Sequence, residues 1–173
     1  QDSKFGIAMG EDLSHMVEYA LNSPHLNFAG LHYHIGSQIH EVEPYMEAAK
    51  LMMEELIRLR TRFRIEIDIL NMGGGFGITD GEGGERQPLS TYLKPVVNYI
   101  AKECEERFYE MPDLIIEPGR WVVGEAGMTL YDVVAVKYRN VGRSIVIVDG
   151  GMSDNIRPAL YDAEYEAMVE YED

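Results

Sequence analysis

Short apolar runs alternate with longer amphipathic stretches along the chain up to about residue 120. Three of the runs have the length of strands and end in glycine or Pro-Gly, which is typical of strands that lead into turns. The stretches between them carry apolar residues at helical spacing. The pattern predicts strands at residues 26–36, 63–70 and 113–120 and helices at residues 44–63 and 89–108. Strands that alternate with helices in this order predict parallel βα units and therefore an α/β fold.

Two prolines and a serine mark the predicted helix ends. Pro44 stands in the first turn of helix 44–63, where a missing N–H costs no intrahelical bond. Ser90 is the expected N-cap of helix 89–108. Pro95 then has to lie in the first turns of that helix or bend it.

The pattern changes near residues 121–128, where we expect a domain boundary. Two runs rich in β-branched residues follow, at 131–139 and 144–149, joined by a short turn around residues 140–142. Such closely spaced runs predict an antiparallel pair. Three parallel strands with two helices leave sheet edges uncovered, so we expect the chain to be part of a larger folding unit.

The charge of the chain limits its partners. Fifteen basic and 30 acidic residues give a net charge of -15, which argues against a nucleic-acid surface and against binding to anionic membranes. No apolar run approaches the roughly 20 residues that a membrane helix needs. We therefore expect an acidic cytoplasmic protein. The single cysteine, Cys104, excludes an internal disulfide and lies in a predicted helix, where we expect it to be a buried bystander.

Unusual polar and glycine-rich residues follow all three predicted parallel strands. The carboxyl ends of such strands meet at one edge of a sheet, which is where ligands bind in parallel α/β folds. After the second strand come Gly73, Gly74, Gly75 and Gly77. Glycines at a strand-to-helix turn let backbone N–H groups approach an anion, above all phosphate. The alternative, a tight turn that needs positive φ, accounts for one or two of them.

The known nucleotide motifs do not match this turn. A G-x-G-x-x-G pattern that starts at Gly73 fails because residue 78 is isoleucine, and the Gly-Lys-Ser/Thr of a Walker loop is absent.

The third strand ends in "EPGR", which supplies Glu117, Gly119 and Arg120. Gly119 offers another backbone N–H, Arg120 suits a phosphate or carboxylate, and Glu117 is expected to point at the site. The alternative is a surface salt bridge between Glu117 and Arg120.

The first strand ends in "HYHIGSQ", with His32 and His34 on the same face. His-x-His at such a strand end also occurs in metal hydrolases, which need further histidines from later strands. No histidine follows residue 40, so the metal alternative is weak and we expect no metal.

Arg157 and Tyr161 stand four residues apart in the C-terminal part of the chain. In a helical turn they lie on one side. A cation beside a phenol suits a substrate carboxylate. The alternative is an exposed arginine and a half-buried tyrosine.

Four motifs resemble, in order and spacing, those of the diaminopimelate decarboxylase family. They are "GLHYHIGSQI", "LNMGGGFGI", "EPGRWVVGEAG" and "VDGGMSDNIRPALYDA". This family belongs to the alanine-racemase-like, fold-type III decarboxylases that use pyridoxal 5'-phosphate (PLP). The resemblance implies the C-terminal part of a TIM (β/α)8 barrel, strands six to eight, over residues 1–124 and the start of an incomplete β-domain over residues 125–173.

The resemblance also implies a role for each motif residue. His34 would stack on the pyridine ring and Glu117 would face its nitrogen, which makes these two the expected catalytic residues. The phosphate would be bound by Ser37, Gly73, Gly74, Gly75, Gly119 and Arg120. The substrate would be held by Arg120, Arg157 and Tyr161. An arginine at the substrate's far end favours an acid-ended side chain over the amine-ended ornithine or arginine.

The implied activity is decarboxylation of meso-2,6-diaminopimelate to L-lysine, in a homodimer with a shared active site. None of the lysines lies in the family's Schiff-base motif, and they are Lys4, Lys50, Lys94, Lys102 and Lys137. The family's Cys-Glu motif would lie beyond Asp173, and Cys104 is not part of it. We therefore expect a fragment that is inactive alone.

Three alternatives to this assignment stay open. The first is another fold-type III decarboxylase that acts on carboxynorspermidine, ornithine, arginine or a carrier-bound amino acid. The second is a non-catalytic PLP-binding relative, and the third is the metal hydrolase.

Overall fold

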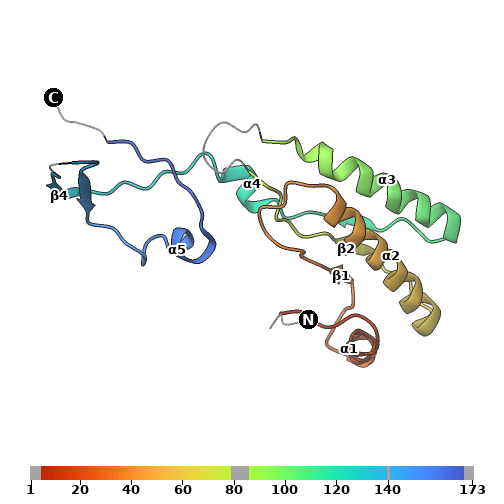
Figure 1. The fold of residues 1–173 in the computed structure, drawn as a ribbon. Helices are drawn as coiled ribbons and strands as arrows, with labels where there is room; N and C mark the ends of the chain where they lie inside the picture. Colours follow the sequence, from red (N-terminus) through yellow and green to blue (C-terminus); the bar gives the residue numbers. More distant parts are fainter. Residues whose placement is uncertain (1–4, 79–85, 140, 170–173) are drawn as a thin grey trace. The chain divides into compact units, whose positions relative to one another are not determined.

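The computed structural model describes residues 5–78, 86–139 and 141–169 (Figure 1). Its elements are α1 (Glu11–Asn22), β1 (Gly30–His32), α2 (Glu43–Phe63), β2 (Ile69–Asn71), α3 (Leu89–Arg107), β3 (Asp113–Ile115), α4 (Gly119–Val123), β4 (Val133–Lys137), β5 (Ile145–Val148) and α5 (Arg157–Tyr161). The chain divides into two compact units. One comprises the residues up to Ile78 together with Gln87–Val122, and the other contains Arg86 and the residues from Val123 on.

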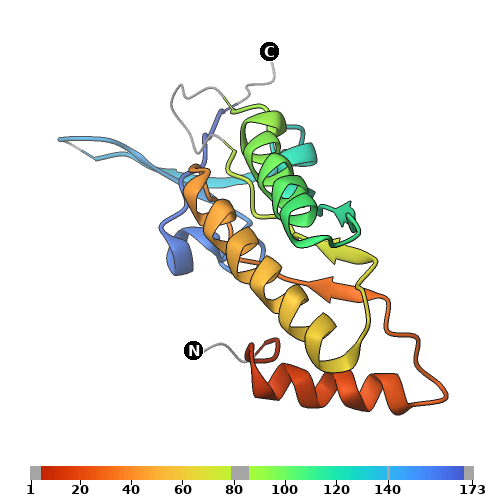
Figure 2. The ribbon, with the colours of Figure 1, turned by 90° about the vertical axis from the view of Figure 1, so that its right-hand side faces the viewer.

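The first unit is built on a parallel three-stranded sheet with the order β1-β2-β3. Leu31, Leu70 and Leu114 lie in register across the strands and share one face. Helices α2 and α3 lie side by side over the sheet (Figure 2). This arrangement confirms the predicted parallel βα units and the α/β class.

The core lies between the sheet and these two helices. Most of its fully buried side chains come from both helices and from β2, and include Met53, Leu56, Leu59, Leu70, Tyr92 and Ile100, and α1 adds Val17. Tyr45 of α2 stacks on Phe76 with 5.0 Å between ring centroids, and Tyr92 of α3 meets Tyr45 edge-on at 5.6 Å. Phe76 follows the glycine turn, so the aromatic cluster anchors that turn to the core.

The other face of the sheet carries the polar residues. Because side chains alternate along a strand, His32 and Asn71 point away from the leucine row. The two residues lie in register across β1 and β2. The alternation therefore gives the sheet an apolar face that packs against the helices and an opposite face that carries His32 and Asn71.

All three strands of this sheet are shorter than predicted. Pairing covers only Gly30–His32, Ile69–Asn71 and Asp113–Ile115. The apolar run before β2 has a different use: the Ile67 N–H donates to the Tyr109 hydroxyl at 2.8 Å instead of to a strand. Ile67 is buried all the same, which is why its hydrophobicity indicated a strand.

The two predicted helices, 44–63 and 89–108, were right in extent, the Ser90 cap was wrong, and α1 was not predicted. Helix α2 has proline in its first turn, as expected. Ser90 does not cap α3, because Pro88 occupies the N-cap and no side-chain capping bond forms. The helix continues past Pro95. Gly119 and Arg120, expected at a strand end, begin the short helix α4.

Helix α1 is fixed to α2 by Arg58. Its guanidinium donates to the Gly10 carbonyl at 2.8 Å and to the Ser14 hydroxyl at 2.6 Å, and it pairs with Glu55. Glu55 is 4% exposed, so the pair leaves no uncompensated buried charge.

The second unit contains the antiparallel pair β4–β5, which confirms the predicted change of pattern. Asn140, in the predicted turn between these strands, lies outside the described residues. Cys104 is buried in the first unit, as expected, and burial raises the pKa of its thiol. None of the helices in the described part of the chain is long and apolar enough to cross a membrane.

The core assignment predicts a difference between two leucines of α2. Leu56 is fully buried and Leu51 is 52% exposed. Leu56→Ala should lower the free energy of unfolding of the full-length protein by about 2–5 kcal/mol, because it leaves a cavity. Leu51→Ala, the matched control, should change it by about 0.5 kcal/mol or less. Urea unfolding measures both, and equal losses would contradict this core.

Candidate active site

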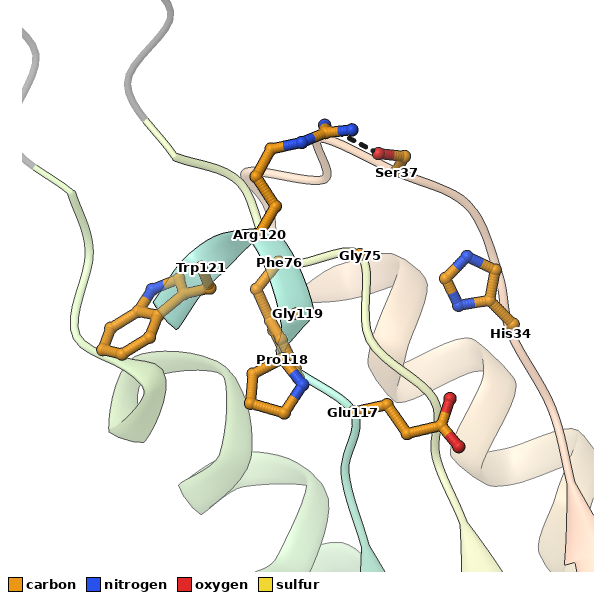
Figure 3. A pocket seen from close by; sticks show the side chains of 9 residues that line it. All are labelled: His34, Ser37, Gly75, Phe76, Glu117, Pro118, Gly119, Arg120 and Trp121. Atoms are coloured by element: carbon orange, nitrogen blue, oxygen red, sulfur yellow. Dashed lines mark hydrogen bonds between the residues drawn. The ribbon is translucent and has the colours of Figure 1, made fainter. Parts of the chain in front are cut away.

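A pocket of about 200 Å³ lies where the loops after β1, β2 and β3 meet (Figure 3). It is lined by His34, Ser37, Gly75, Phe76, Glu117, Pro118, Gly119, Arg120 and Trp121. The structure thus brings together six of the residues singled out from the sequence. Gly73 and Gly74 are buried in the same loop but do not line the pocket.

The glycine turn is enclosed between its two neighbouring loops. Gly73 and Gly75 have positive φ, +65° and +86°. A Cβ on Gly74 would overlap the Glu117 carbonyl, and one on Gly75 would overlap the Gly36 carbonyl. A Cβ on Gly77 would overlap the His40 ring. Positive φ therefore accounts for two of the four glycines, as expected, and packing against neighbouring residues accounts for Gly74 and Gly77.

Hydrogen bonds join the loop after β1 to the glycine turn. The Ile39 N–H donates to the Gly75 carbonyl at 3.0 Å, and the Gly77 N–H donates to the Ile39 carbonyl at 2.9 Å. The Gln38 side-chain amide pairs with both backbone groups of Ile78, at 3.1 and 3.2 Å. The loop after β1 and the glycine turn thus form one hydrogen-bonded backbone wall of the pocket.

One end of the pocket is suited to an anion. Arg120 donates from Nη1 to the Ser37 hydroxyl at 3.0 Å. The N–H groups of Gly75 and Phe76 have no acceptor among the residues that the structure describes. The Gly119 N–H, expected to be available, donates to the Glu117 carbonyl at 2.8 Å. A guanidinium, a hydroxyl and free N–H groups together match the donors that bind phosphate.

The other end of the pocket carries a carboxylate. Glu117 Oε1 accepts a hydrogen bond from Asn71 Nδ2 at 2.8 Å, and His32 Nε2 lies 3.5 Å from Oε2. The Glu117 side chain is 54% exposed. The alternative of a surface salt bridge between Glu117 and Arg120 is wrong. Glu117 contacts Asn71 and His32, and Arg120 contacts Ser37.

The imidazole of His34 lies between the two ends, with Arg120 and Ser37 above it and Glu117 below it in Figure 3. The Gly74 N–H donates to His34 Nδ1 at 3.4 Å. Nδ1 is therefore the acceptor nitrogen, and in the neutral ring the proton is on Nε2. This contact holds the ring beside the glycine turn.

Two tyrosines support the pocket from the core side. The Tyr45 hydroxyl donates to the Gly74 carbonyl at 3.4 Å. Burial raises the pKa of the Tyr45 hydroxyl and raises that of Tyr33 to about 12. Both hydroxyls stay protonated at neutral pH; that of Tyr45 is a hydrogen-bond donor, whereas that of Tyr33 is buried without a hydrogen-bond partner among the described residues.

Arg157 and Tyr161 belong to the second unit. They form one helical turn, α5, with Arg157 Cζ 5.6 Å from the centroid of the Tyr161 ring. This confirms that the two side chains share a side of the turn. Arg157 Nε donates to the Tyr165 hydroxyl at 3.1 Å.

Sequence reasoning missed several residues of this site. The sequence patterns assigned no role to Asn71, Phe76 or Trp121. Trp121 Nε1 donates to the Gln87 carbonyl at 3.2 Å, which fixes α4 beside the start of α3. The alternation of β2 could have placed Asn71 on the polar face, whereas Tyr165 lies outside any periodic element.

Comparison with known proteins identifies the family to which the chain belongs. Residues 1–124 match a family model described as pyridoxal-dependent decarboxylase, pyridoxal binding domain. The chain is 43% identical over 170 residues to a diaminopimelate decarboxylase of Bacillus methanolicus, which covers 98% of the chain and 39% of that relative. The chain therefore spans about two fifths of the length of the relatives it matches.

Solved structures agree with this match. A diaminopimelate decarboxylase from M. jannaschii in complex with L-lysine superposes with a TM-score of 0.82 at 32% identity, over 96% of this chain and 38% of that one. One from Helicobacter pylori, also complexed with L-lysine, gives 0.77 at 31% identity, over 96% and 39%. These neighbours confirm the fold assignment, the C-terminal part of a (β/α)8 barrel followed by the start of a β-domain.

The packing of the glycine turn predicts different effects of alanine at two glycines. Gly74→Ala should destabilise the cofactor-free full-length protein by roughly 1–3 kcal/mol or more, because the new methyl group meets a backbone carbonyl. Gly119→Ala, the control, meets nothing within 4 Å and should leave the melting temperature nearly unchanged. Calorimetry of both variants tests this. A destabilising Gly119→Ala with a tolerated Gly74→Ala would refute the described loop packing.

Proposed function

Because the chain belongs to the pyridoxal-dependent decarboxylase family, we propose that the protein of which it is a part decarboxylates meso-2,6-diaminopimelate to L-lysine. The names of its relatives at 39–43% identity support the substrate. The observation that carries the proposal is the pocket itself. Donors for an anion lie at one end, a carboxylate lies at the other, and an imidazole lies between them.

These residues fit PLP. Ser37, Arg120 and the Gly75 N–H would bind its phosphate. His34 would lie against the pyridine ring, and Glu117 would hold the proton of the ring nitrogen. Gly73 and Gly74 act indirectly by shaping the turn, and Gly119 leaves space beside the phosphate end because no atom lies within 4 Å of its missing Cβ.

The residues of the chain divide the chemistry between them. When bound, PLP supplies an electron sink for the electron pair that the departing CO₂ leaves behind. Glu117 would keep the ring nitrogen protonated, because a carboxylate beside it favours the protonated form. His34 would lie against the ring and restrain its position. The phosphate donors fix the orientation.

Selection of the substrate falls to α5. The terminal nitrogens of Arg157 would pair with the far carboxylate of diaminopimelate, while Tyr161 and Tyr165 hold the guanidinium. A substrate that ends in an amine would leave Arg157 unpaired and place two cations together. Arg120 is a second candidate cation for the same substrate.

Other parts of the longer protein complete the site in this proposal. The described lysines do not line the pocket: Lys50 and Lys102, for example, pair with Glu47 and Glu106 in their own helices. Lys4 lies outside the described residues. We place the Schiff-base lysine outside this chain, in a cytoplasmic homodimer that shares its active sites between subunits. The barrel and β-domain limits, residues 1–124 and 125–173, are part of the same proposal.

The full-length protein should bind PLP and release CO₂ from meso-diaminopimelate. Its kcat/KM should exceed that for ornithine or arginine by at least roughly a hundredfold, because those substrates cannot pair with the arginine. Glu117→Gln should retain the cofactor's visible absorbance and lose most of kcat. Equal use of ornithine would overturn the substrate, and a PLP-loaded protein that releases no CO₂ from any of the three would overturn the decarboxylase proposal.

Removal of the Arg157 charge should weaken substrate binding and leave cofactor binding unchanged. Arg157→Ala should raise KM for diaminopimelate roughly ten- to a hundredfold, because a charged hydrogen-bonded pair is lost. Cofactor absorbance should stay the same. The exposed Arg143→Ala is the control for loss of a positive charge and should have normal kinetics. Loss of cofactor in the Arg157 variant would place this residue at the phosphate instead.

A further inference from the structure

Asn71 connects the glycine turn to the Glu117 carboxylate by two hydrogen bonds, although the sequence assigned no role to it. It ends β2 and shares the polar face of the sheet with His32, its partner in register on β1. Its side-chain oxygen Oδ1 accepts a hydrogen bond from the Gly73 N–H at 2.9 Å. Its nitrogen Nδ2 donates to Glu117 Oε1 at 2.8 Å.

The first of these bonds fixes the direction of the second. An amide that accepts from a backbone N–H has to present its NH₂ on the opposite side. Asn71 can therefore meet Glu117 only as a donor, and a carboxylate oxygen is the acceptor that suits it. The Gly73 N–H is itself fixed by the positive φ of the glycine turn.

Glu117 needs such a restraint. Its side chain is 54% exposed, and the terminal torsion of a glutamate has a broad, weakly restricted range. Its backbone is fixed, because its N–H donates to the Gly73 carbonyl at 2.7 Å. The remaining side-chain contact, His32 Nε2 to Oε2, is longer, at 3.5 Å. The Asn71 bond is the shorter of the two that orient the carboxylate.

We infer that Asn71 is a positioning residue that orients the Glu117 carboxylate toward the ring nitrogen of the cofactor and couples that orientation to the glycine turn. The inference rests on the proposed function, because it takes Glu117 as the partner of that nitrogen. Asn71 then acts on the reaction only through Glu117. Its loss should lower kcat without loss of substrate or cofactor affinity.

Two substitutions of Asn71 separate its bonds in the full-length enzyme. Asn71→Ser keeps a short side-chain acceptor for the Gly73 N–H and removes the donor to Glu117. Asn71→Asp keeps the acceptor and places a second carboxylate against Glu117. Both should lower kcat roughly ten- to a hundredfold, the usual effect of losing a hydrogen bond to a charged group. KM and the Kd for PLP should stay within about threefold.

A double-mutant cycle tests whether Asn71 acts through Glu117. Adding Asn71→Ser to Glu117→Gln should change kcat by less than about threefold, because the group that Asn71 orients has already lost its charge. Asn22→Ser is the control. Asn22 is an exposed residue at the end of α1 and donates to the Glu18 carbonyl at 3.0 Å, and its variant should have normal kinetics.

A crystal structure of each cofactor-free protein supplies a readout that does not depend on activity. The wild type should show a single Glu117 orientation bonded to Asn71, and Asn71→Ser should show a displaced or multiple orientation. An unchanged Glu117 in that variant would overturn the inference, as would a kcat within about twofold of wild type or a full multiplicative loss in the Glu117→Gln background. A wild-type enzyme that releases no CO₂ would overturn the proposed function instead, and the crystal structures would still decide the role of Asn71.

Discussion

The pocket depends on the close contact of three backbone segments at the carboxyl ends of β1, β2 and β3. The turn after β2 lies between the other two loops with no space for a Cβ at Gly74, where the Glu117 carbonyl lies, or at Gly75, where the Gly36 carbonyl lies. Close-packed atoms do not yield gradually, so this contact fixes the spacing of the three loops. Because Tyr45 and Phe76 join the turn to the core, the stability of the helices supports the geometry of the site.

This contact also separates the charges of the site. Ser37 and Arg120 lie at one end of the backbone wall, and Glu117 lies at the other, held by Asn71. The guanidinium and the carboxylate do not neutralise each other, because Arg120 bonds Ser37 whereas Glu117 contacts Asn71 and His32. A ligand with an anionic group at one end and a ring N–H at the other can therefore satisfy both. The parallel register also contributes, because it places His32 and Asn71 side by side on one face of the sheet, where both contact the Glu117 carboxylate.

Periodicity and turn chemistry predicted the parallel units, α2 almost to the residue, and the meeting of three motifs at one edge. The strand lengths were overestimated because buried residues such as Ile67 satisfy their N–H groups with a side chain, which a pattern of hydrophobicity does not reveal. The glycines indicated an anion, but their immediate cause is contact with other loops, and such contacts depend on residues distant in sequence. Asn71 was missed for the same reason: its two partners are assigned by tertiary structure.

The two units carry different parts of the proposed reaction. Every residue that lines the pocket belongs to the first unit, where the glycine turn leaves little freedom to change without loss of packing. Arg157 belongs to the second unit, on a single helical turn where it is held by Tyr161 and Tyr165. A substitution there removes a charge and two side-chain contacts but disturbs no close backbone contact. Under the proposed function, substitution at Arg157 would therefore alter substrate preference with less disturbance of the fold than substitution in the glycine turn would cause.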